Sequence, residues 1–400
     1  MLVHRSVLQR SLLIVGIVLI AVNLRPALAG VGPLISDIRQ DMGLSNTMLG
    51  LLTTLPLLAF GVVSALTPLV TRRLGLERTL AAALLLLATG LLLRTVPSVA
   101  LLFGGTALLG VAIAFGNVLL PSLVKRDFPE RIGVMTSVYS SAMGVGAALA
   151  AGISVPLAVG LGLGWRGSLG AWAFLAVVAL GVWLPQLKDR TLPRHTTSLR
   201  KSLHDLGRTR LAWNVALFMG LQSLTFYAIL AWLPEVLQNR GLDAGYAGWM
   251  LALSQGAGIL GTILIPTWAE RLPDQRLIVL ALILLEGVSL VGLLLPDTTW
   301  APLWVSTIGF TLGGSFGLSL LFIVLRSANT ETATELSGMA QSIGYLLAAT
   351  GPTLFGFLHD VSHSWSGPLL FLIVILLGKL MMGLGAGRPQ KITSRFDAPG

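Results

Sequence analysis

Twelve apolar stretches dominate this sequence, and they limit what it can fold into more than any other feature. A helix that crosses the hydrocarbon of a bilayer needs about 20 mostly apolar residues. The stretches cover roughly 11–35, 47–70, 79–96, 99–123, 132–158, 167–187, 211–236, 245–268, 276–295, 301–325, 333–358 and 366–386. Only 11% of the residues are charged, against about 25% in soluble proteins. The sequence therefore predicts an all-α membrane protein with twelve transmembrane helices.

The links between the predicted spans are short, except for the polar, basic segment 188–210. With both chain ends on one side of the membrane, that side holds 21 of the 27 Lys and Arg residues, the other side four, and the spans two. Because basic residues mark the cytoplasmic side, both termini are expected to be cytoplasmic. The net charge of +10 is then explained by topology, and no nucleic-acid partner is expected. We predict an N-terminal half at 1–187, a cytoplasmic linker at 188–210, a C-terminal half at 211–386 and a cytoplasmic tail at 387–400.

The two predicted halves repeat each other at an offset of 198 to 201 residues. The residues that align are Pro33 with Pro234, Pro68 with Pro266, Arg73 with Arg271, Arg78 with Arg276, Arg126 with Arg326, Ser137 with Ser337 and Gly144 with Gly344. Parallel repeats joined by a cytoplasmic link are typical of secondary transporters whose site lies between the halves at the bilayer midplane. We therefore expect two pseudo-symmetric six-helix halves.

Arg25 is the strongest single functional signal, because it lies about 20 Å into the first span and reaches neither membrane surface easily. A central arginine costs about 2.5–3.5 kcal/mol on insertion scales. Its planar fork suits two acceptor atoms, so it favours an anionic or electron-rich planar solute. The alternative is a partner inside the bundle, such as helix carbonyls. Asn23, Pro26 and Gly30 nearby predict a bendable, cavity-facing segment.

A secretory signal peptide ending at Ala27–Ala29 is the competing interpretation of the first span. Cleavage there would remove the repeat partner of the seventh span, so the first span is expected to persist.

Polar side chains at the predicted depth of Arg25 come from several spans. They are Asn117, Tyr139, Gln222, Ser223, Tyr227, Gln255, Gln341 and Tyr345. Amides and hydroxyls orient a solute without adding net charge, so we predict that they form the substrate site with Asn23 and Arg25. The alternative for each of them is a hydrogen bond between helices.

Other chemistry has weaker support in the sequence. Glu286 is the one carboxylate well inside a predicted span, which makes it a candidate for proton coupling; a hydrogen bond to a neighbouring helix is the alternative. Ser315 in GGSFG (313–317) matches the G-x-S-x-G pattern of hydrolases. It lies inside an apolar span without a nearby histidine, so we expect no enzyme. The chain has no cysteine and no P-loop pattern, and no cofactor or metal is expected.

The twelve spans, the long central link and the basic loop TRRLGLER (71–78) resemble the major facilitator superfamily, although no Asp stands before Arg72. More narrowly, four stretches resemble the cyanate/2-nitroimidazole transporter family, most closely its 2-nitroimidazole branch. They are NLRPALAGVGPLI (23–35), GLLTTLPLLAF (50–60), GNVLLPSLVKRDFP (116–129) and LSGMAQSIGYLLAATGP (336–352).

The resemblance implies a secondary transporter of the bacterial inner membrane that works by alternating access. Its expected substrate is a small planar anion or a nitro/azole compound, with 2-nitroimidazole as a case of export. Arg72, Arg73 and Arg78 would form a gating loop. The expected partners are the substrate and membrane lipid, and the chain is expected to be a monomer. A broad drug–proton antiporter that uses Glu286 remains the alternative.

Overall fold

The computed structural model describes residues 7–128, 132–188, 207–328 and 330–392, and these form helices and their connections. The first half contains α1 (Val7–Asn23), α2 (Pro26–Ala29), η1 (Gly32–Leu34), α3 (Ile35–Met42), α4 (Asn46–Leu74), α5 (Leu76–Leu93), α6 (Val99–Asp127), α7 (Ile132–Val155), η3 (Pro156–Gly160), α8 (Gly164–Trp183) and η4 (Leu184–Lys188). The second half contains α10 (Arg210–Gln238), α11 (Ala244–Ala269), α12 (Arg276–Leu294), α13 (Ala301–Leu325), α14 (Thr330–Ser362) and α15 (Ser366–Ala386). Most of the predicted linker, 189–206, lies outside the described residues.

Eleven segments of the described chain are long and apolar enough to cross a membrane. The first of them, Ser11–Met42, comprises α1, α2, η1 and α3. The predicted span at 333–358 is a long helix, α14, but it carries Ser, Thr, Gln and Gly among its apolar residues. It packs against α10 of its own half and also against α4 of the other half. α14 is therefore less apolar than the eleven other spans and lies where the two halves meet.

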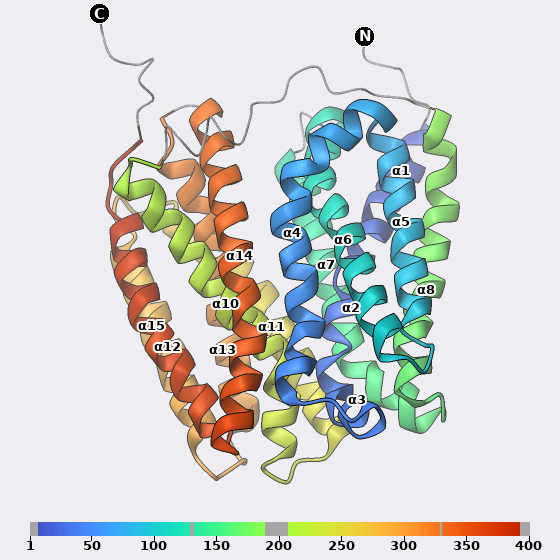
Figure 1. The fold of residues 1–400 in the computed structure, drawn as a ribbon. Helices are drawn as coiled ribbons and strands as arrows, with labels where there is room; N and C mark the ends of the chain where they lie inside the picture. Colours follow the sequence, from blue (N-terminus) through green and yellow to red (C-terminus); the bar gives the residue numbers. More distant parts are fainter. Residues whose placement is uncertain (1–6, 129–131, 189–206, 329, 393–400) are drawn as a thin grey trace, which may run out of the picture.

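The helices form two bundles that repeat the same packing pattern (Figure 1). In the first bundle α4 packs on α6, α6 on α5, and α5 on α8. In the second, α11 packs on α13, α13 on α12, and α12 on α15. These are the same pairs by position in each half, so the structure confirms the two pseudo-symmetric halves that the sequence offset predicts.

A repeated polar contact supports the same conclusion at residue level. Arg126, near the end of α6, donates from Nη1 to Glu77 Oε1 at 2.5 Å. Its repeat partner Arg326, just after α13, donates from Nη2 to Gln275 Oε1. The two contacts close 49 and 51 residues of chain. The repeat has therefore kept this contact while exchanging a carboxylate for an amide.

The first span is broken near its middle. α1 ends at Asn23, and after two turn residues the four-residue helix α2 begins at Pro26. Pro26 has no N–H, so the Val22 carbonyl lacks its helical partner. α7 covers that carbonyl, and a Cβ on Gly146 would lie only 2.4 Å from the Val22 oxygen, so only glycine fits there. The break places Arg25 on irregular backbone inside the bundle, a feature typical of transporter substrate sites.

Candidate substrate site

Arg25 joins the two halves at the break in the first span. Its Nη1 donates to the hydroxyl of Tyr227 on α10 at 2.7 Å. The guanidinium carbon lies 5.9 Å from the ring centroids of both Phe226 and Tyr227, within the range of a cation–π attraction. Arg25 keeps part of its surface accessible, whereas Tyr227 is buried. A cation in the middle of the bundle is therefore held by aromatic side chains, and its residue is not fully enclosed.

Two further tyrosines of the predicted set lie around this contact. Tyr345 on α14 interacts electrostatically with Tyr227, Arg25 and Tyr139 on α7. Its ring also packs edge-on against Phe60 of α4, with centroids 5.4 Å apart. The ionisable groups that interact with Arg25 in the described chain are Tyr227 and Tyr345, and neither is a carboxylate. The structure thus brings Arg25, Tyr227 and Tyr345 together, with Tyr139 beside Tyr345, and no described carboxylate joins them.

The predicted amides are arranged differently. Asn117, Gln255 and Gln341 are partly accessible, and Gln341 donates to Ser337 Oγ on its own helix at 3.0 Å. Gln222 and Ser223 are buried on α10 and hydrogen-bond to each other at 2.7 Å. Within the described chain, none of these five side chains hydrogen-bonds to Arg25.

Asn23 hydrogen-bonds within the first half and not to Arg25. Its Nδ2 donates to the carbonyl of Leu19 at 2.8 Å and to that of Leu175 on α8 at 3.3 Å. The side chain is buried and fixes the end of α1 against α8.

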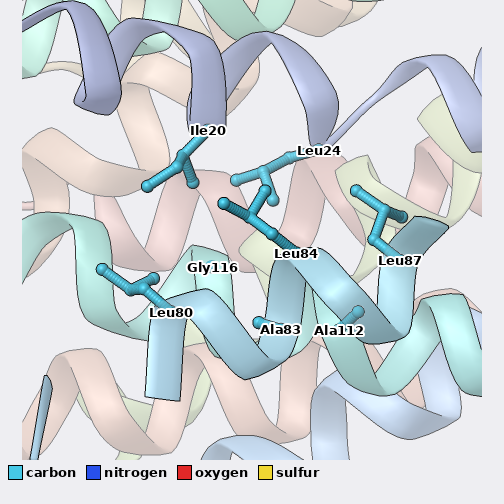
Figure 2. Close-up of a pocket in the computed structure, with 8 residues that line it drawn as sticks. All are labelled: Ile20, Leu24, Leu80, Ala83, Leu84, Leu87, Ala112 and Gly116. Atoms are coloured by element: carbon cyan, nitrogen blue, oxygen red, sulfur yellow. The ribbon is translucent and has the colours of Figure 1, made fainter. Parts of the chain in front are cut away.

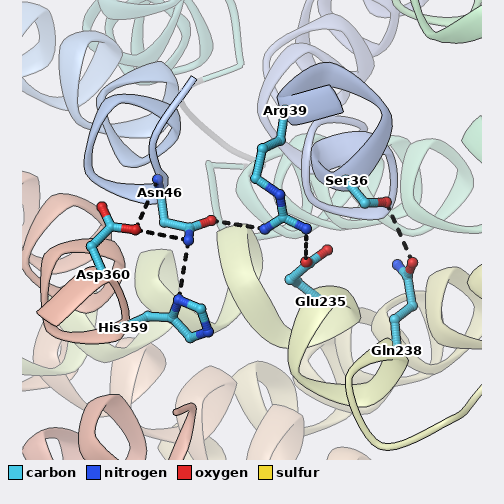
Figure 3. A network of polar contacts seen from close by, with 7 residues as sticks. All are labelled: Ser36, Arg39, Asn46, Glu235, Gln238, His359 and Asp360. Carbon is cyan, nitrogen blue, oxygen red and sulfur yellow. Dashed lines mark hydrogen bonds and ion pairs between the residues drawn. The ribbon is translucent and has the colours of Figure 1, made fainter. Parts of the chain in front are cut away.

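A polar network closes the α3 end of the bundle, shown in Figure 3. Arg39 on α3 donates to Asn46 Oδ1 at 2.9 Å and to Glu235 Oε1 on α10 at 2.5 Å. Asn46 Nδ2 in turn contacts Asp360 Oδ1 at 2.8 Å and His359 Nδ1 at 3.0 Å, both on α14. Together with Thr47, these residues are called the α3-end latch below. It connects α3 and α4 of the first half to α10 and α14 of the second half.

Asp360 occupies a favourable place for an anion in the latch. It accepts from the backbone N–H groups of Asn46 and Thr47, at 3.2 and 2.8 Å, and from Thr47 Oγ1 at 2.6 Å. A carboxylate of the second half therefore caps the N-terminus of α4 in the first half, where helix N–H groups favour negative charge. Partial burial works to raise the pKa of Asp360, which lies beyond the predicted span, but these hydrogen bonds outweigh it and the pKa lies below its ordinary value.

His359 must be neutral for the latch to close as observed. Asn46 Nδ2 can only donate, so the ring nitrogen it meets has to accept. Burial lowers the pKa of His359, as do Arg39 and His363, while Asp360 acts in the opposite direction. Protonation of His359 would set two donors against each other and weaken the latch.

Glu286 lies in a separate environment. On α12 it pairs with Lys379 of α15 at 2.5 Å, and both side chains are fully buried. Its second oxygen, Oε1, has no partner among the described residues. The proton-coupling candidate is thus bound to a cation inside one half.

The predicted gating loop is partly described. Arg73 and Arg78 are exposed, whereas the side chain of Arg72 lies outside the described part. Glu77, in the same loop, forms an ion pair with Arg126. The loop therefore has an acidic residue in an ion pair, although no Asp stands before Arg72.

One apolar pocket lies between α1, α5 and α6 (Figure 2). Its lining is entirely apolar: Ile20, Leu24, Leu80, Ala83, Leu84, Leu87, Ala112 and Gly116. Without a polar group it cannot orient an anion, so it is not the candidate site.

The family profile described as Major Facilitator Superfamily matches residues 13–352. The chain belongs to the major facilitator superfamily. It is a multi-pass membrane transporter and not an enzyme. Ser315, which matches the hydrolase pattern, accordingly lies fully buried in the middle of the continuous helix α13.

Three curated relatives span nearly the full chain. An uncharacterized transporter of Bacillus subtilis (strain 168), YycB, is 47% identical over 97% of this chain and 96% of its own. The 2-nitroimidazole transporter of Escherichia coli (strain K12) is 44% identical, with coverage of 96% and 97%. The cyanate transport protein CynX of the same organism is 32% identical, with coverage of 92% and 95%. This chain is therefore a secondary transporter related to the 2-nitroimidazole and cyanate transporters.

Solved structures agree on the fold. The crystal structure of a bacterial homolog to the human lysosomal transporter Spinster matches with a TM-score of 0.77, covering 96% of this chain and 97% of that one. At 16% sequence identity, this likeness is evidence for the fold alone.

The α3-end latch and the burial of Arg94 were not predicted from the sequence. Arg39 lies just beyond the predicted first span and joins the halves, and Arg94, near the end of the predicted span 79–96, is fully buried. Arg39 and Glu235 lie 196 residues apart, so no local pattern shows their pairing. The available signal was that Glu235 directly follows Pro234, the repeat partner of Pro33 in the first span.

Proposed function

We propose that this chain moves a small planar anion or a nitro/azole compound, of the cyanate or 2-nitroimidazole kind, across the bacterial inner membrane. The observation that carries the proposal is the state of Arg25, a partly accessible arginine at the helix break whose hydrogen-bond partner is a tyrosine hydroxyl and not a carboxylate. An intramembrane charge of this kind marks a substrate pathway by default. The 2-nitroimidazole and cyanate transporters among the relatives suggest the class of solute.

The chemistry of the site fits such a solute. The two Nη groups of Arg25 can donate to two oxygens or nitrogens of one planar molecule. The solute would replace the Tyr227 hydroxyl at Nη1, and the rings of Phe226 and Tyr227 offer flat surfaces for a planar group. Tyr345 and Tyr139 would add hydroxyls around it.

Alternating access follows from the two bundles and the latch between them. We assign the outer side to the α3 end, with both termini cytoplasmic, because of the distribution of Lys and Arg. The latch then closes the outer side, and its release would let the 1–187 and 211–386 halves rock around Arg25. The linker 188–210 would be the cytoplasmic connection, and a single chain would suffice.

The drug–proton antiporter alternative depends on Glu286 as a free proton carrier. Glu286 is paired with Lys379 within the second half, so it could exchange a proton only after that pair breaks. The arrangement supports a structural role for it.

A ligand panel tests the proposed substrate class. Purified protein would be heated with cyanate, nitrate, 2-nitroimidazole, unsubstituted imidazole or a lipophilic cation, beside the variant Arg25→Met. A solute at 100 times its Kd adds about 2.7 kcal/mol of stability. We expect a small anion or 2-nitroimidazole to stabilise the wild type and not the variant. Stabilisation by the cation alone would reject the proposal.

The latch is tested by cross-linking, which the cysteine-free chain makes straightforward. Beside the latch, Ser36 Oγ donates to Gln238 Oε1 across the halves at 3.4 Å. The double variant Ser36→Cys/Gln238→Cys should form a disulfide that stops uptake into vesicles, and a reductant should restore it. Undiminished uptake by the oxidised variant would show that this end does not need to open.

A further inference from the structure

Arg94 directly follows α5 and is fully buried. Its Nη1 donates to the carbonyl of Ala27 at 2.9 Å. Ala27 belongs to α2, the short helix that begins directly after Arg25. A second arginine thus reaches the helix break from behind, on the side away from the second half.

The Ala27 carbonyl needs such a partner because the break frees it. In a continuous helix it would accept from the N–H of Val31. Here the Val31 N–H goes to Leu28 at 3.3 Å instead. A buried carbonyl without a donor is unfavourable in a membrane, and Arg94 satisfies this one.

Asn23 holds the other side of the same turn. It donates to the carbonyls of Leu19 and Leu175, which fixes the end of α1 to α8. The turn that carries Arg25 is therefore fixed at both ends, by an amide on one side and a guanidinium on the other.

Arg94 lies where α5 and α6 approach each other closely. A Cβ on Gly105 of α6 would lie 2.6 Å from the Gly90 carbonyl oxygen and 3.1 Å from Arg94 Cγ, so the glycine permits the backbone approach and also leaves room for the arginine stem. The guanidinium is fully buried, and its Nε and Nη2 have no partner among the described residues. Burying a cation for one carbonyl bond is expensive. A methionine would fill the space without that penalty, so packing alone does not explain Arg94.

We propose that Arg94 is a positioning residue for the substrate site, holding α2 so that the guanidinium of Arg25 points toward Tyr227 and the path between the halves. The proposal extends the proposed function, since it assigns a second arginine to the Arg25 site. Arg94 touches no solute and acts through the backbone of the break.

A thiol-labelling experiment tests the geometry without any ligand. An Arg25→Cys variant would be labelled with a small methanethiosulfonate reagent, alone and combined with Arg94→Met or Arg94→Lys. Loss of the Ala27 contact should change the labelling rate at position 25 by about tenfold in Arg94→Met. Arg94→Lys retains a charged donor, so it should bring the labelling rate close to that of the Arg25→Cys variant with Arg94 intact. If Arg94→Met does not fold, we replace it with Arg94→Gln, whose side chain is too short to reach the Ala27 carbonyl.

Gln255→Cys is the matched control, because Gln255 is partly accessible but lies on α11 in the other half. Its labelling rate should not respond to Arg94. Equal rates at position 25 in all Arg94 backgrounds would overturn the proposal. A parallel change at both positions would also overturn it, because Arg94 would then act on the overall state of the transporter.

A binding experiment connects Arg94 to the solute. With cyanate and 2-nitroimidazole as probes, Arg94→Met should weaken binding about tenfold in the wild-type background and have no further effect when Arg25 is already Met. Additive losses in the two variants would contradict a role through Arg25. If neither probe binds the wild type, the proposed function fails, whereas the labelling result still decides the role of Arg94.

Discussion

Arg25 and Lys379 both lie deep within membrane spans of the described chain, and their surroundings are opposite in kind. Lys379 is fully buried and paired with Glu286 at 2.5 Å inside one half. Arg25 is partly accessible, lies between the halves, and has a neutral tyrosine as its hydrogen-bond partner. Within the described residues, Lys379 has a carboxylate partner and Arg25 has none.

The difference suggests how to distinguish structure from function in a membrane interior. A buried charge in hydrocarbon needs compensation. Where the chain supplies the counter-charge, the pair can fix how two helices pack, and no solute is required. Where it supplies only dipoles and aromatic faces, as at Arg25, the missing counter-charge is what an anionic or acceptor-rich solute provides.

Arg39 is intermediate between Arg25 and Lys379. It has a carboxylate partner, Glu235, but the pair crosses from one half to the other and 30% of the Arg39 side chain is exposed. The proposed cycle opens this pair, so we expect it to be weaker than the Glu286–Lys379 pair, which stays within one half.

The largest expected effect is on the enclosed pair. Lys379→Met leaves Glu286 buried without its cation, which should destabilise the protein by about 3–5 kcal/mol. Glu286→Leu combined with Lys379→Leu removes both charges and should restore stability and keep uptake. Thermal unfolding and vesicle uptake check this. A stable double variant that has lost uptake would instead make Glu286 the proton-coupling residue.

The next effect is on the open cation. Arg25→Met removes a charge that no described carboxylate compensates, so the unliganded protein should unfold at the same temperature as the wild type or higher. Solute binding should weaken by about 2–3 kcal/mol, the loss of charged hydrogen bonds. Arg25→Lys is the matched control, because it keeps the charge but not the fork. A large loss of unliganded stability in Arg25→Met would place Arg25 with Lys379 as a structural cation.

A smaller effect is expected at the latch. Arg39→Gln and Glu235→Gln should each loosen the α3 end by about 1 kcal/mol, because the pair is partly exposed. The labelling rate of a Ser36→Cys variant would report the loosening. The double variant should be no looser than either single one, since the interaction is already lost. Strictly additive effects would show that the two residues do not act as a pair.

The smallest effect is a pH response of the same latch. Since burial lowers the pKa of His359 in the closed state, protonation favours the open state. Stability of the latch from His359 is present above the ordinary histidine pKa of about 6.5 and is lost as pH falls below it. Asp360, whose pKa is lowered, stays charged in that range.

Ser36→Cys labelling should therefore rise about two- to fivefold between pH 7.5 and 5.5. The charged groups that act on His359 are Asp360, Arg39 and His363, so the controls must separate the two histidines. The response should vanish in His359→Asn and persist in His363→Asn. A response that follows His363 would remove His359 from this account.

The sequence predicted the fold well because its signals are local or periodic. Apolar runs, the basic linker and the constant offset between the halves can each be recognised in the sequence without knowing any contact. The paired contacts of Arg126 with Glu77 and of Arg326 with Gln275 show that even the degenerate repeat carried structural information.

The site was predicted in part, and the reason is side-chain direction. Arg25 and the tyrosines were recognisable as polar groups at one depth, and the structure brings them together. Depth alone does not say which way a side chain points, so Asn23 and the Gln222–Ser223 pair were grouped with them although they bond elsewhere. Positions 23 and 25 already point to opposite sides of a helix, and the direction of Arg25 also depends on the turn after Asn23, where Pro26 ends the helical pattern, which the sequence does not specify in detail.

The most direct test is an isothermal titration of three proteins with the solute that the ligand panel selects: the wild type, Arg25→Met, and the Glu286→Leu/Lys379→Leu double variant. The account predicts that the double variant binds with wild-type affinity, whereas Arg25→Met shows at least about a 30-fold weaker Kd. Undiminished binding by Arg25→Met would contradict the central claim that the uncompensated arginine is where the substrate binds.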